Sequence, residues 1–312
     1  MNIDIAVPTY NSAQWLDAFL ESIVQQDFSN WRIVTRDDGS KDGTENIILS
    51  WGNRLGEKIK IIKNPEKINL GIVGNYEAIF DECCAELIMV GDPDDVWKPG
   101  KITLTYEVMM QAEKEFGVDM PIVIGTDAEP VDKDLKPISP SLWKWARMNT
   151  NSTSKLSLMV MENPVLGPTM LFNRPLLTLA MPLNGGAAYH DWWLALVACA
   201  FGKIVLIKKS TLLYRRHGAN DSLEPLTQNY SQAAKKIGKA HSRVQFLIRQ
   251  LALQATAFSL RFRDKLKTSD YLALEAASCL PSSTMVMRRV RVIRHGLWFG
   301  SFIKNVGMMV FL

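Results

Sequence analysis

Short apolar runs alternate with amphipathic segments along the first half of the chain. Five runs have the length and composition of buried strands: Ile3–Val7, Arg32–Thr35, Lys58–Ile62, Leu87–Gly91 and Pro121–Gly125. Segments between them carry apolar side chains at helical spacing: Ser12–Gln26, about Thr44–Trp51 and Gly74–Cys83. Alternating strands and helices with short connections predict an α/β fold with a doubly wound, mostly parallel sheet flanked by helices.

The pattern loosens after residue 125. Segment Ser139–Ser154 has two Trp residues, many polar residues and no strong period. It fits either a mobile loop over a ligand site or a surface excursion held by its Trp side chains, and we expect the loop. Regular structure returns at Pro168–Phe172 and in a helix that begins near His190. Because only helices are predicted from about Ser222, we expect one domain over residues 1–220 and a helical extension over 221–312.

Polar motifs directly follow three of the predicted strands. They are Pro8-Thr9-Tyr10-Asn11, Asp37-Asp38-Gly39-Ser40 and Asp92-Pro93-Asp94-Asp95. In doubly wound sheets, ligands bind at the carboxyl ends of the strands. Three such motifs at one edge of the sheet therefore predict a ligand site there.

The motif Asp92–Asp95 places three carboxylates at a strand end, where they repel one another and lose hydration. A divalent cation that bridges them to a diphosphate would account for this cost, because hard oxygen ligands suit Mg²⁺ or Mn²⁺. The alternative is a solvated Asp-Pro turn that caps the next helix.

The motif Asp37–Ser40 has the composition of a turn. Its second carboxylate, Asp38, is placed to accept a hydrogen bond from a nucleobase imide or a ribose, although turn formation alone also explains the motif.

Two later motifs carry further candidate chemistry. In His190-Asp191-Trp192-Trp193, Asp191 fits either a helix N-terminal acid or a general base beside rings that stack on a sugar. In Tyr214-Arg215-Arg216-His217, the cations suit a diphosphate leaving group, and His217 suits a third metal ligand. A basic surface patch is the alternative for the second motif.

Charge is distributed unevenly in a chain whose composition, 47% hydrophobic and 22% charged, is that of a globular protein. Residues 201–312 hold 19 Lys and Arg against 5 Asp and Glu, whereas residues 1–200 hold 17 against 27. The basic part predicts an anionic partner, first the phosphates of a lipid or membrane surface. Because no nucleic-acid-binding motif accompanies the charge, we expect no nucleic acid.

The basic stretch Arg288–His295 runs into the aromatic and aliphatic residues Gly296–Phe299. This composition is typical of an interfacial helix on anionic lipid. A helix packed on the domain of residues 1–220, or a dimerisation element that makes a homo-oligomer, is the alternative. The four cysteines show no zinc-type spacing, and we find no signal peptide. We therefore expect a cytoplasmic protein, peripherally associated with the inner face of the cell membrane.

These motifs, taken in order, resemble family 2 glycosyltransferases over about residues 1–220. The set includes Asn69-Leu70-Gly71 and the longer motif Asp92–Trp97. The closing Tyr214–His217 resembles the branch with bacterial polysaccharide and rhamnosyl transferases. The resemblance implies a GT-A fold and transfer of a sugar, with inversion, from a nucleotide diphosphate donor. It also implies a glycan acceptor, commonly lipid-diphosphate-linked in relatives that build O-antigen or capsule.

The resemblance assigns roles by position. Asp94 would be the principal ligand of Mg²⁺ or Mn²⁺, with Asp92 and His217 beside it, and Asp191 would be the catalytic base. His190, Trp192 and Trp193 would bind the acceptor. The donor would contact Pro8, Thr9, Tyr10, Asp38, Asn69, Gly71, Asp92, Arg215 and Arg216.

Two departures from the family pattern stand out. Pro93 occupies the variable position of the Asp-x-Asp motif, and Asn69–Asn75 lacks the Arg that many relatives place after Asn-x-Gly. A nucleotidyltransferase is a rival interpretation, but Pro8–Ser12 supplies no Gly-rich phosphate loop. A catalytically inactive scaffold is another, which the joint presence of Asp38, Asp92, Asp94 and Asp191 disfavours. The donor sugar, dTDP-rhamnose or a UDP-hexose, stays open.

Overall fold

The computed structural model describes residues 2–183, 185–217, 233–300, 304–306 and 309, with residues 233–244 as backbone alone. The chain divides into two compact units. The first lies within residues 1–142, 165–184 and 189–217, and the second within 143–164, 185–188 and 218–312. Residues 143–164 thus belong to the same unit as the C-terminal helices, which the sequence pattern did not predict. The functional division near residue 220 stays a prediction.

An eight-stranded sheet forms the centre of the first unit, in the order β3-β2-β1-β4-β7-β6-β8-β5. Its strands are β1 (Ile3–Thr9), β2 (Trp31–Asp37), β3 (Ile59–Ile62), β4 (Leu87–Val90), β5 (Val96–Trp97), β6 (Ile122–Val131), β7 (Met170–Asn173) and β8 (Lys203–Arg215). Strands β1 to β4 pair in parallel, as predicted. Strand β7 is antiparallel to both of its neighbours and β5 is antiparallel to β8, so the second half of the sheet is mixed.

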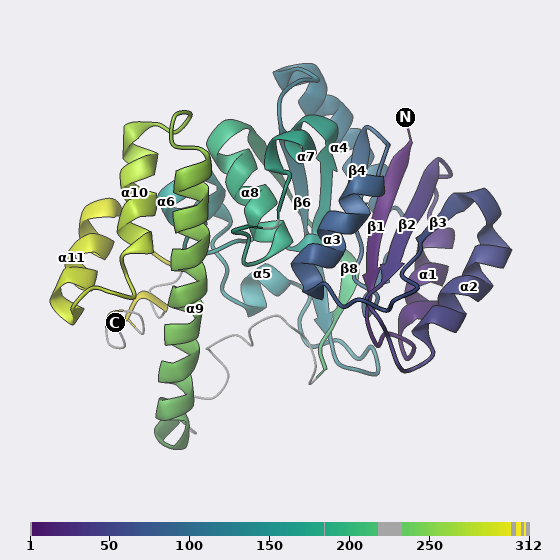
Figure 1. Ribbon diagram of the computed structural model, residues 1–312, viewed down its shortest axis with the longest axis horizontal. Coiled ribbons are helices and arrows are strands. Elements are labelled where there is room, and N and C mark those ends of the chain that lie inside the picture. The colour runs from purple at the N-terminus through teal and green to yellow at the C-terminus, as the bar shows by residue number, and fades with distance from the viewer. Residues whose placement is uncertain (1, 184, 218–232, 301–303, 307–308, 310–312) are drawn as a thin grey trace. The chain divides into compact units, whose positions relative to one another are not determined.

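Helices flank this sheet, as Figure 1 shows. They are α1 (Leu16–Val24), α2 (Thr44–Leu55), α3 (Gly71–Glu82), α4 (Lys101–Phe116), α7 (Arg174–Ala180) and α8 (His190–Phe201), with short 3₁₀ turns η1 (Gly56–Lys58) and η3 (Gly167–Thr169). The predicted α/β class with helices around a doubly wound sheet is confirmed.

The core of this unit lies between the central strands and their helices. Several side chains of the central strands are fully buried. They include Ile3, Ile5 and Val7 of β1 and every residue of β4. Strands buried on both faces read as continuous apolar runs rather than alternating ones. This is why the sequence locates them so clearly.

Strand direction places the polar motifs at one edge. Strand β8 is parallel to β6, and both are antiparallel to β7, which is itself antiparallel to β4. Strands β1, β2, β4 and β8 therefore point the same way, and their carboxyl ends meet at one edge of the sheet. The residues that follow them are the ones singled out by the sequence.

The second unit contains the helices α9 (Ala233–Arg261), α10 (Thr268–Ser278) and α11 (Met285–His295), seen in green to yellow in Figure 1. With them lie most of α5 (Leu142–Trp145), η2 (Thr150–Ser154) and α6 (Leu156–Met159). Helix α10 packs against α9, α11 and α6. The helical character predicted beyond residue 222 holds for α9, α10 and α11. Residues 222–232 lie outside the described part.

The expected mobile loop at residues 139–154 is wrong. Trp143 is buried, and its indole N–H donates to the carbonyl oxygen of Pro164 at 2.8 Å. A buried aromatic ring with a satisfied N–H anchors a segment firmly. The alternative, a segment held by its Trp side chains, is correct for Trp143.

Within the described residues, no helix combines the length and apolar character that crossing a bilayer requires.

Candidate functional site

The ends of β1 and β2 lie side by side, with Thr9 opposite Asp37 in the parallel register. Thr9 is buried, and its hydroxyl donates to Asp37 Oδ1 at 3.1 Å and to the carbonyl oxygen of Arg36 at 3.3 Å. Asp37 also accepts hydrogen bonds from the hydroxyl and the backbone N–H of Ser40. Asp37 therefore orders the turn.

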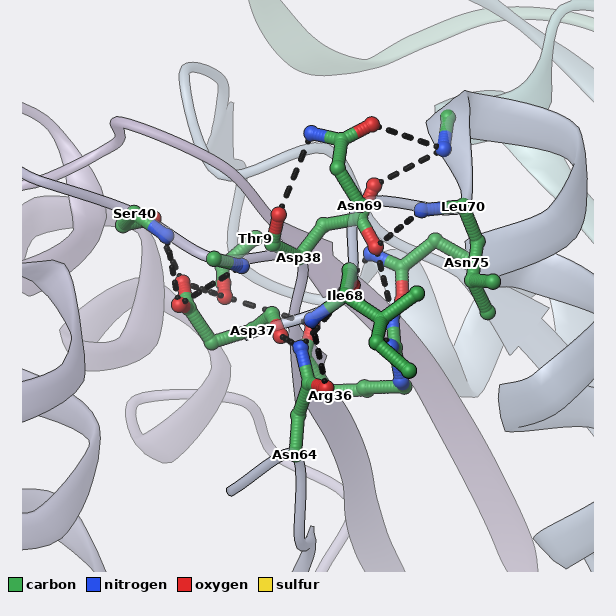
Figure 2. A network of polar contacts seen from close by, with 12 residues as sticks. Thr9, Arg36, Asp37, Asp38, Ser40, Asn64, Ile68, Asn69, Leu70 and Asn75 are labelled. Atoms are coloured by element: carbon green, nitrogen blue, oxygen red, sulfur yellow. Dashed lines mark hydrogen bonds and ion pairs between the residues drawn. The ribbon is translucent and has the colours of Figure 1, made fainter. Parts of the chain in front are cut away.

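The Asp38 carboxylate lies beside the start of α3 (Figure 2). Its Oδ1 accepts from the backbone N–H of Leu70 at 2.8 Å, and its Oδ2 from that of Gly71 at 2.9 Å. Asn69 donates through its side chain to the Asp38 carbonyl oxygen. A carboxylate that accepts N–H groups at a helix N-terminus is stabilised by both the bonds and the helix dipole.

Arg36 completes this network from β2. Its guanidinium is buried, pairs with Asp38 at 2.5 Å and donates to Asn75 Oδ1 at 2.9 Å. It also donates to the carbonyl oxygen of Ile68 at 2.9 Å, as Figure 2 shows. A buried ion pair needs such additional hydrogen bonds to offset its desolvation. Arg36 and Asp38 together fix the segment that leads into α3.

Three carboxylates gather after β4. Oxygen atoms of Asp92, Asp94 and Asp95 lie within 4.8 Å of one another. Asp95 is buried, and its Oδ1 accepts from the backbone N–H of Arg215, while Oδ2 has no hydrogen-bond partner among the residues that the structure describes. Burial first, then the charges of Asp94 and Asp92, raise the pKa of Asp95 well above its ordinary value. An oxygen-only donor set with an unpaired buried acceptor fits a hard divalent cation.

The end of β8 meets this cluster. His217 Nε2 lies 2.9 Å from Asp94 Oδ2, and Arg215 Nε donates to the Asp94 carbonyl oxygen at 2.7 Å. The guanidinium of Arg215 lies 4.3 Å from the centre of the Trp15 ring, and the His217 ring stacks on the same indole at 5.8 Å. Trp15, which sequence reasoning missed, is thus a platform for both of these predicted site residues.

Lys101, at the start of α4, places a buried cation near the cluster. Its ammonium donates to the carbonyl oxygen of Pro168 at 2.9 Å and lies 4.8 Å from the Trp97 ring centre. Burial lowers the pKa of Lys101 to about 7, and the charge of Asp95 opposes that shift. Lys101 thereby joins the β4 end to the turn η3.

Asp191 stands in the first turn of α8. The backbone N–H of Gly167 donates to its Oδ2 at 3.0 Å, and the backbone N–H of Trp192 to its Oδ1 at 2.6 Å. Burial raises the pKa of Asp191 to about 6, although these N–H groups lower it. A half-buried carboxylate with a pKa near neutrality suits proton abstraction.

His190 is buried, and neither of its ring nitrogen atoms has a hydrogen-bond partner within the described residues. Burial lowers the pKa of His190 to about 3, so the ring is neutral. It stacks on Tyr76 of α3 with ring centres 3.6 Å apart. The Tyr76 hydroxyl donates to Asp92 Oδ1 at 2.7 Å.

The other predicted residues occupy varied positions. Tyr10, Asn69 and Gly71 are exposed, Arg216 and Trp192 are half-buried, and Pro8 is buried in β1. Trp193 is buried, and its indole N–H donates to the carbonyl oxygen of Ala180 at 3.0 Å. The donor and acceptor roles of all these residues stay predictions.

The structure thus brings together the ends of β1, β2, β4 and β8 at one edge of the sheet. It adds residues that sequence reasoning missed: Trp15, Arg36, Asn75, Tyr76, Lys101 and Gly167. Asn75 and Tyr76 lie on the helix that follows the Asn69-Leu70-Gly71 motif. Their position just after this motif was the sequence signal that could have identified both.

A family model described as glycosyl transferase family 2 matches residues 4–160. This range contains the ends of β1, β2 and β4 and the three-carboxylate cluster. The chain belongs to glycosyltransferase family 2.

Two relatives of this glycosyltransferase are bacterial. A Nostoc sp. protein named "Uncharacterized glycosyltransferase alr2836" is 27% identical over 241 residues, which cover 75% of this chain and 71% of that protein. The Escherichia coli UDP-Glc:alpha-D-GlcNAc-diphosphoundecaprenol beta-1,3-glucosyltransferase WfgD is 25% identical over 114 residues, which cover 36% of this chain and 43% of WfgD.

A solved structure shares the fold of this glycosyltransferase. It is the mannosyltransferase PcManGT of Pyrobaculum calidifontis in complex with GDP-Man and Mn²⁺. The TM-score is 0.55 at 15% identity, with 99% of this chain and 83% of that chain covered. A likeness at this identity shows the fold alone.

Proposed function

We propose that this glycosyltransferase moves a sugar from a nucleotide diphosphate donor to a hydroxyl group of a glycan, with inversion at the anomeric carbon and with Mg²⁺ or Mn²⁺ bound at Asp92 and Asp94. The observation that carries the proposal is the cluster of Asp92, Asp94 and Asp95 at the strand edge. Three carboxylates in such proximity are costly without a compensating cation.

The leaving-group side of the reaction lies at this cluster. A divalent cation held there would neutralise charge on the departing diphosphate. His217 faces Asp94, and the backbone carbonyl of Asp94 is fixed by Arg215. We assign Asp94 as the principal ligand and Asp92 and His217 as its neighbours. Arg215 holds the β8 end against the cluster.

The acceptor side of the reaction lies at Asp191. With a pKa of about 6, the carboxylate is ionised at neutral pH and is a stronger base than an ordinary Asp. Its two oxygen atoms accept backbone N–H groups of Gly167 and Trp192, which fix the carboxylate for proton abstraction from a sugar hydroxyl. Trp192, half-buried beside it, is our choice for stacking on the acceptor.

For the acceptor we propose a lipid-diphosphate-linked glycan in the synthesis of a bacterial cell-surface polysaccharide. The printed name of WfgD gives that relative a diphosphoundecaprenol-linked acceptor. A lipid-linked acceptor is presented at a membrane, and the basic helix α11 supports peripheral association there. Helix α11 exposes Val286 and Ile293 beside Arg294 and has no acidic residue. We place this association at the cytoplasmic face.

Thermal shift with nucleotide sugars tests the donor half of this proposal. A ligand that binds the native state raises the melting temperature. We expect one of dTDP-rhamnose, UDP-glucose, UDP-galactose or UDP-N-acetylhexosamine to raise it in the presence of Mn²⁺ or Mg²⁺. The rise should shrink after chelation of the metal and in the Asp94→Asn variant. No metal-dependent shift with any nucleotide sugar would contradict the proposal.

A further inference from the structure

The side chain of Tyr76 contacts both the leaving-group side and the acceptor side of the proposed site. The residue is buried in α3, and its hydroxyl donates to Asp92 Oδ1 at 2.7 Å. The face of its ring lies against His190, with ring centres 3.6 Å apart and the planes inclined by 25°. Asp191 follows His190 directly.

The phenol is a neutral donor in this position. Its oxygen atom lies 2.7 Å from Asp92 Oδ1, and an ionised carboxylate only accepts hydrogen bonds, so the phenol supplies the proton. A neutral O–H that donates to a carboxylate makes a short, directional bond, which fixes the plane of the acceptor.

The position of His190 depends on packing. Neither ring nitrogen has a hydrogen-bond partner within the described residues, so Tyr76 on one side and Gly167 on another restrain the ring. A Cβ atom at Gly167 would lie 2.9 Å from His190 Nε2, which shows how closely that backbone approaches. The same Gly167 donates its N–H to Asp191. Tyr76, His190 and Gly167 thus form one packed unit around the start of α8.

We propose that Tyr76 is a positioning residue: its hydroxyl orients Asp92 for the metal-bound diphosphate, and its ring holds the start of α8 that carries Asp191. The inference rests on the proposed function, since it assigns Tyr76 a part in that reaction. The hydroxyl and the ring have separable effects. Loss of the hydroxyl acts on donor and metal binding, and loss of the ring acts on turnover.

The Tyr76→Phe variant tests the hydroxyl. It keeps the ring stacked on His190 and removes only the bond to Asp92. We expect the Mn²⁺ concentration for half-maximal activity and the donor KM to rise about tenfold, as expected for a lost hydrogen bond to a charged group. The acceptor KM should not change. Tyr106→Phe in α4, which makes the same chemical change beside Phe28, is the matched control and should leave all three values as in the unaltered protein.

A double-mutant cycle separates this role from a general contribution to folding. Mn²⁺ and nucleotide-sugar dissociation constants are measured by calorimetry for Tyr76→Phe, Asp92→Asn and the double variant. If Tyr76 acts through Asp92, its substitution changes donor binding little once Asp92 has been replaced. Additive effects, or wild-type metal and donor affinity in Tyr76→Phe, would overturn the inference. If the unaltered protein itself shows no metal-dependent donor binding, the proposed function fails as well.

The ring is tested by Tyr76→Leu. We expect this variant to lose more kcat than Tyr76→Phe at saturating donor and metal, because Asp191 is then less well held. Equal kcat values in the two variants would contradict the part of the inference that concerns the ring. Should Tyr76→Leu fail to fold, Tyr76→Met removes the ring with a smaller change in shape, and a kcat equal to that of Tyr76→Phe would again contradict this part of the inference.

Discussion

At Asp191, two opposing influences set the basicity of the carboxylate. Burial raises its pKa, and the N–H groups of Gly167 and Trp192 lower it, with a net value of about 6. An ordinary Asp would be a weaker base, and a fully buried one without these donors would be protonated at neutral pH. The chain thus keeps Asp191 ionised and still basic enough to accept a proton from a hydroxyl group.

The pH dependence of turnover follows from this value. As the proposed base, Asp191 works only when ionised, so kcat/KM should fall as the pH drops through about 6 and level off above it. Initial rates of nucleotide diphosphate release between pH 5 and pH 8.5, at saturating metal, measure the profile. A rate that is flat down to pH 5 would contradict the assignment of Asp191.

Substitution of Asp191 should separate catalysis from binding. We expect Asp191→Asn to lower kcat by about 10²–10⁴-fold, the usual contribution of general base catalysis, while nucleotide-sugar affinity stays unchanged. The lost negative charge near the site is the main confounding change, and calorimetric titration of the donor controls for it. Near-normal turnover would remove Asp191 from the mechanism.

The same substitution makes a prediction about stability. The pKa of Asp191 rises from its ordinary 3.8 to about 6 on folding, so the folded state favours the protonated acid. Below pH 3.8 the group is protonated in both states and the buried charge costs nothing. Above pH 6 the charge is present in the folded state and lowers the free energy of unfolding in full, so the protein is less stable at pH 8 than it would be without this charge. Asp191→Asn should raise the free energy of unfolding at pH 8 by about 1–3 kcal/mol, and by less at pH 5. Denaturant titrations at both pH values measure the difference, and a loss of stability at pH 8 would contradict the argument.

At the residue scale, the sequence singled out some residues of the site and missed others. Asp92, Asp94 and Asp191 stand out in the sequence because carboxylates next to apolar runs are unusual. Asp38 was predicted to face the donor base, and the structure shows its oxygen atoms engaged by the start of α3 and by Arg36. Tyr76 was missed because its role depends on a partner 16 residues away that only the fold brings close.

At the scale of elements, Glu162 anchors the second unit. Its buried carboxylate accepts from the backbone N–H groups of Asn149 at 3.0 Å and Gly300 at 2.9 Å, and pairs with Lys304. One side chain thereby joins residues near α6 to the stretch that follows α11. Breaking a buried pair leaves an uncompensated charge, and this is where the cost of substitution arises.

We expect Glu162→Ala to destabilise the protein by about 3–5 kcal/mol, because Lys304 and two backbone N–H groups lose their acceptor. Asp134→Ala is the matched control, since Asp134 pairs with Lys133 at an exposed site, and it should cause little measurable change. Chemical denaturation followed by circular dichroism measures both variants. Equal stability of the two would show that Glu162 does not anchor the unit.

Elements differed in how well they could be predicted. Strands β1 and β4 were located because every residue in them is buried, which leaves an apolar run. The antiparallel strands β5 and β7 have two and four residues, too short to show direction or partner in sequence. Segment Ser139–Ser154 was misjudged because its order depends on contacts such as the Trp143–Pro164 hydrogen bond.

At the scale of the whole molecule, the uneven charge leads us to predict that the protein binds an anionic membrane surface. The last 112 residues, 201–312, hold 19 Lys and Arg against 5 Asp and Glu. In α11, Val286, Val290 and Ile293 are exposed among Arg residues. Basic side chains that flank exposed apolar ones are typical of helices at anionic lipid surfaces.

We therefore expect the protein to sediment with anionic liposomes and to be released by salt. Substitution of Arg294 by Glu together with Ile293 by Ser should weaken binding at least about tenfold, since each basic residue near such a surface contributes about 1 kcal/mol. Lys133→Ala, an exposed charge of the first unit, is the matched control and should bind as before. Equal binding to neutral and anionic liposomes would contradict the electrostatic part of this account.

The central claim is that a divalent cation at the Asp92–Asp94 site and the base Asp191 act together in acceptor-dependent sugar transfer. Its most direct test is the rate of nucleotide diphosphate release from the donor identified by thermal shift, with a lipid-diphosphate-linked glycan as acceptor. We predict release that requires the acceptor, stops on chelation, returns with Mn²⁺ or Mg²⁺ and is lost in Asp94→Asn. Acceptor-dependent release that survives both chelation and Asp94→Asn would contradict the account.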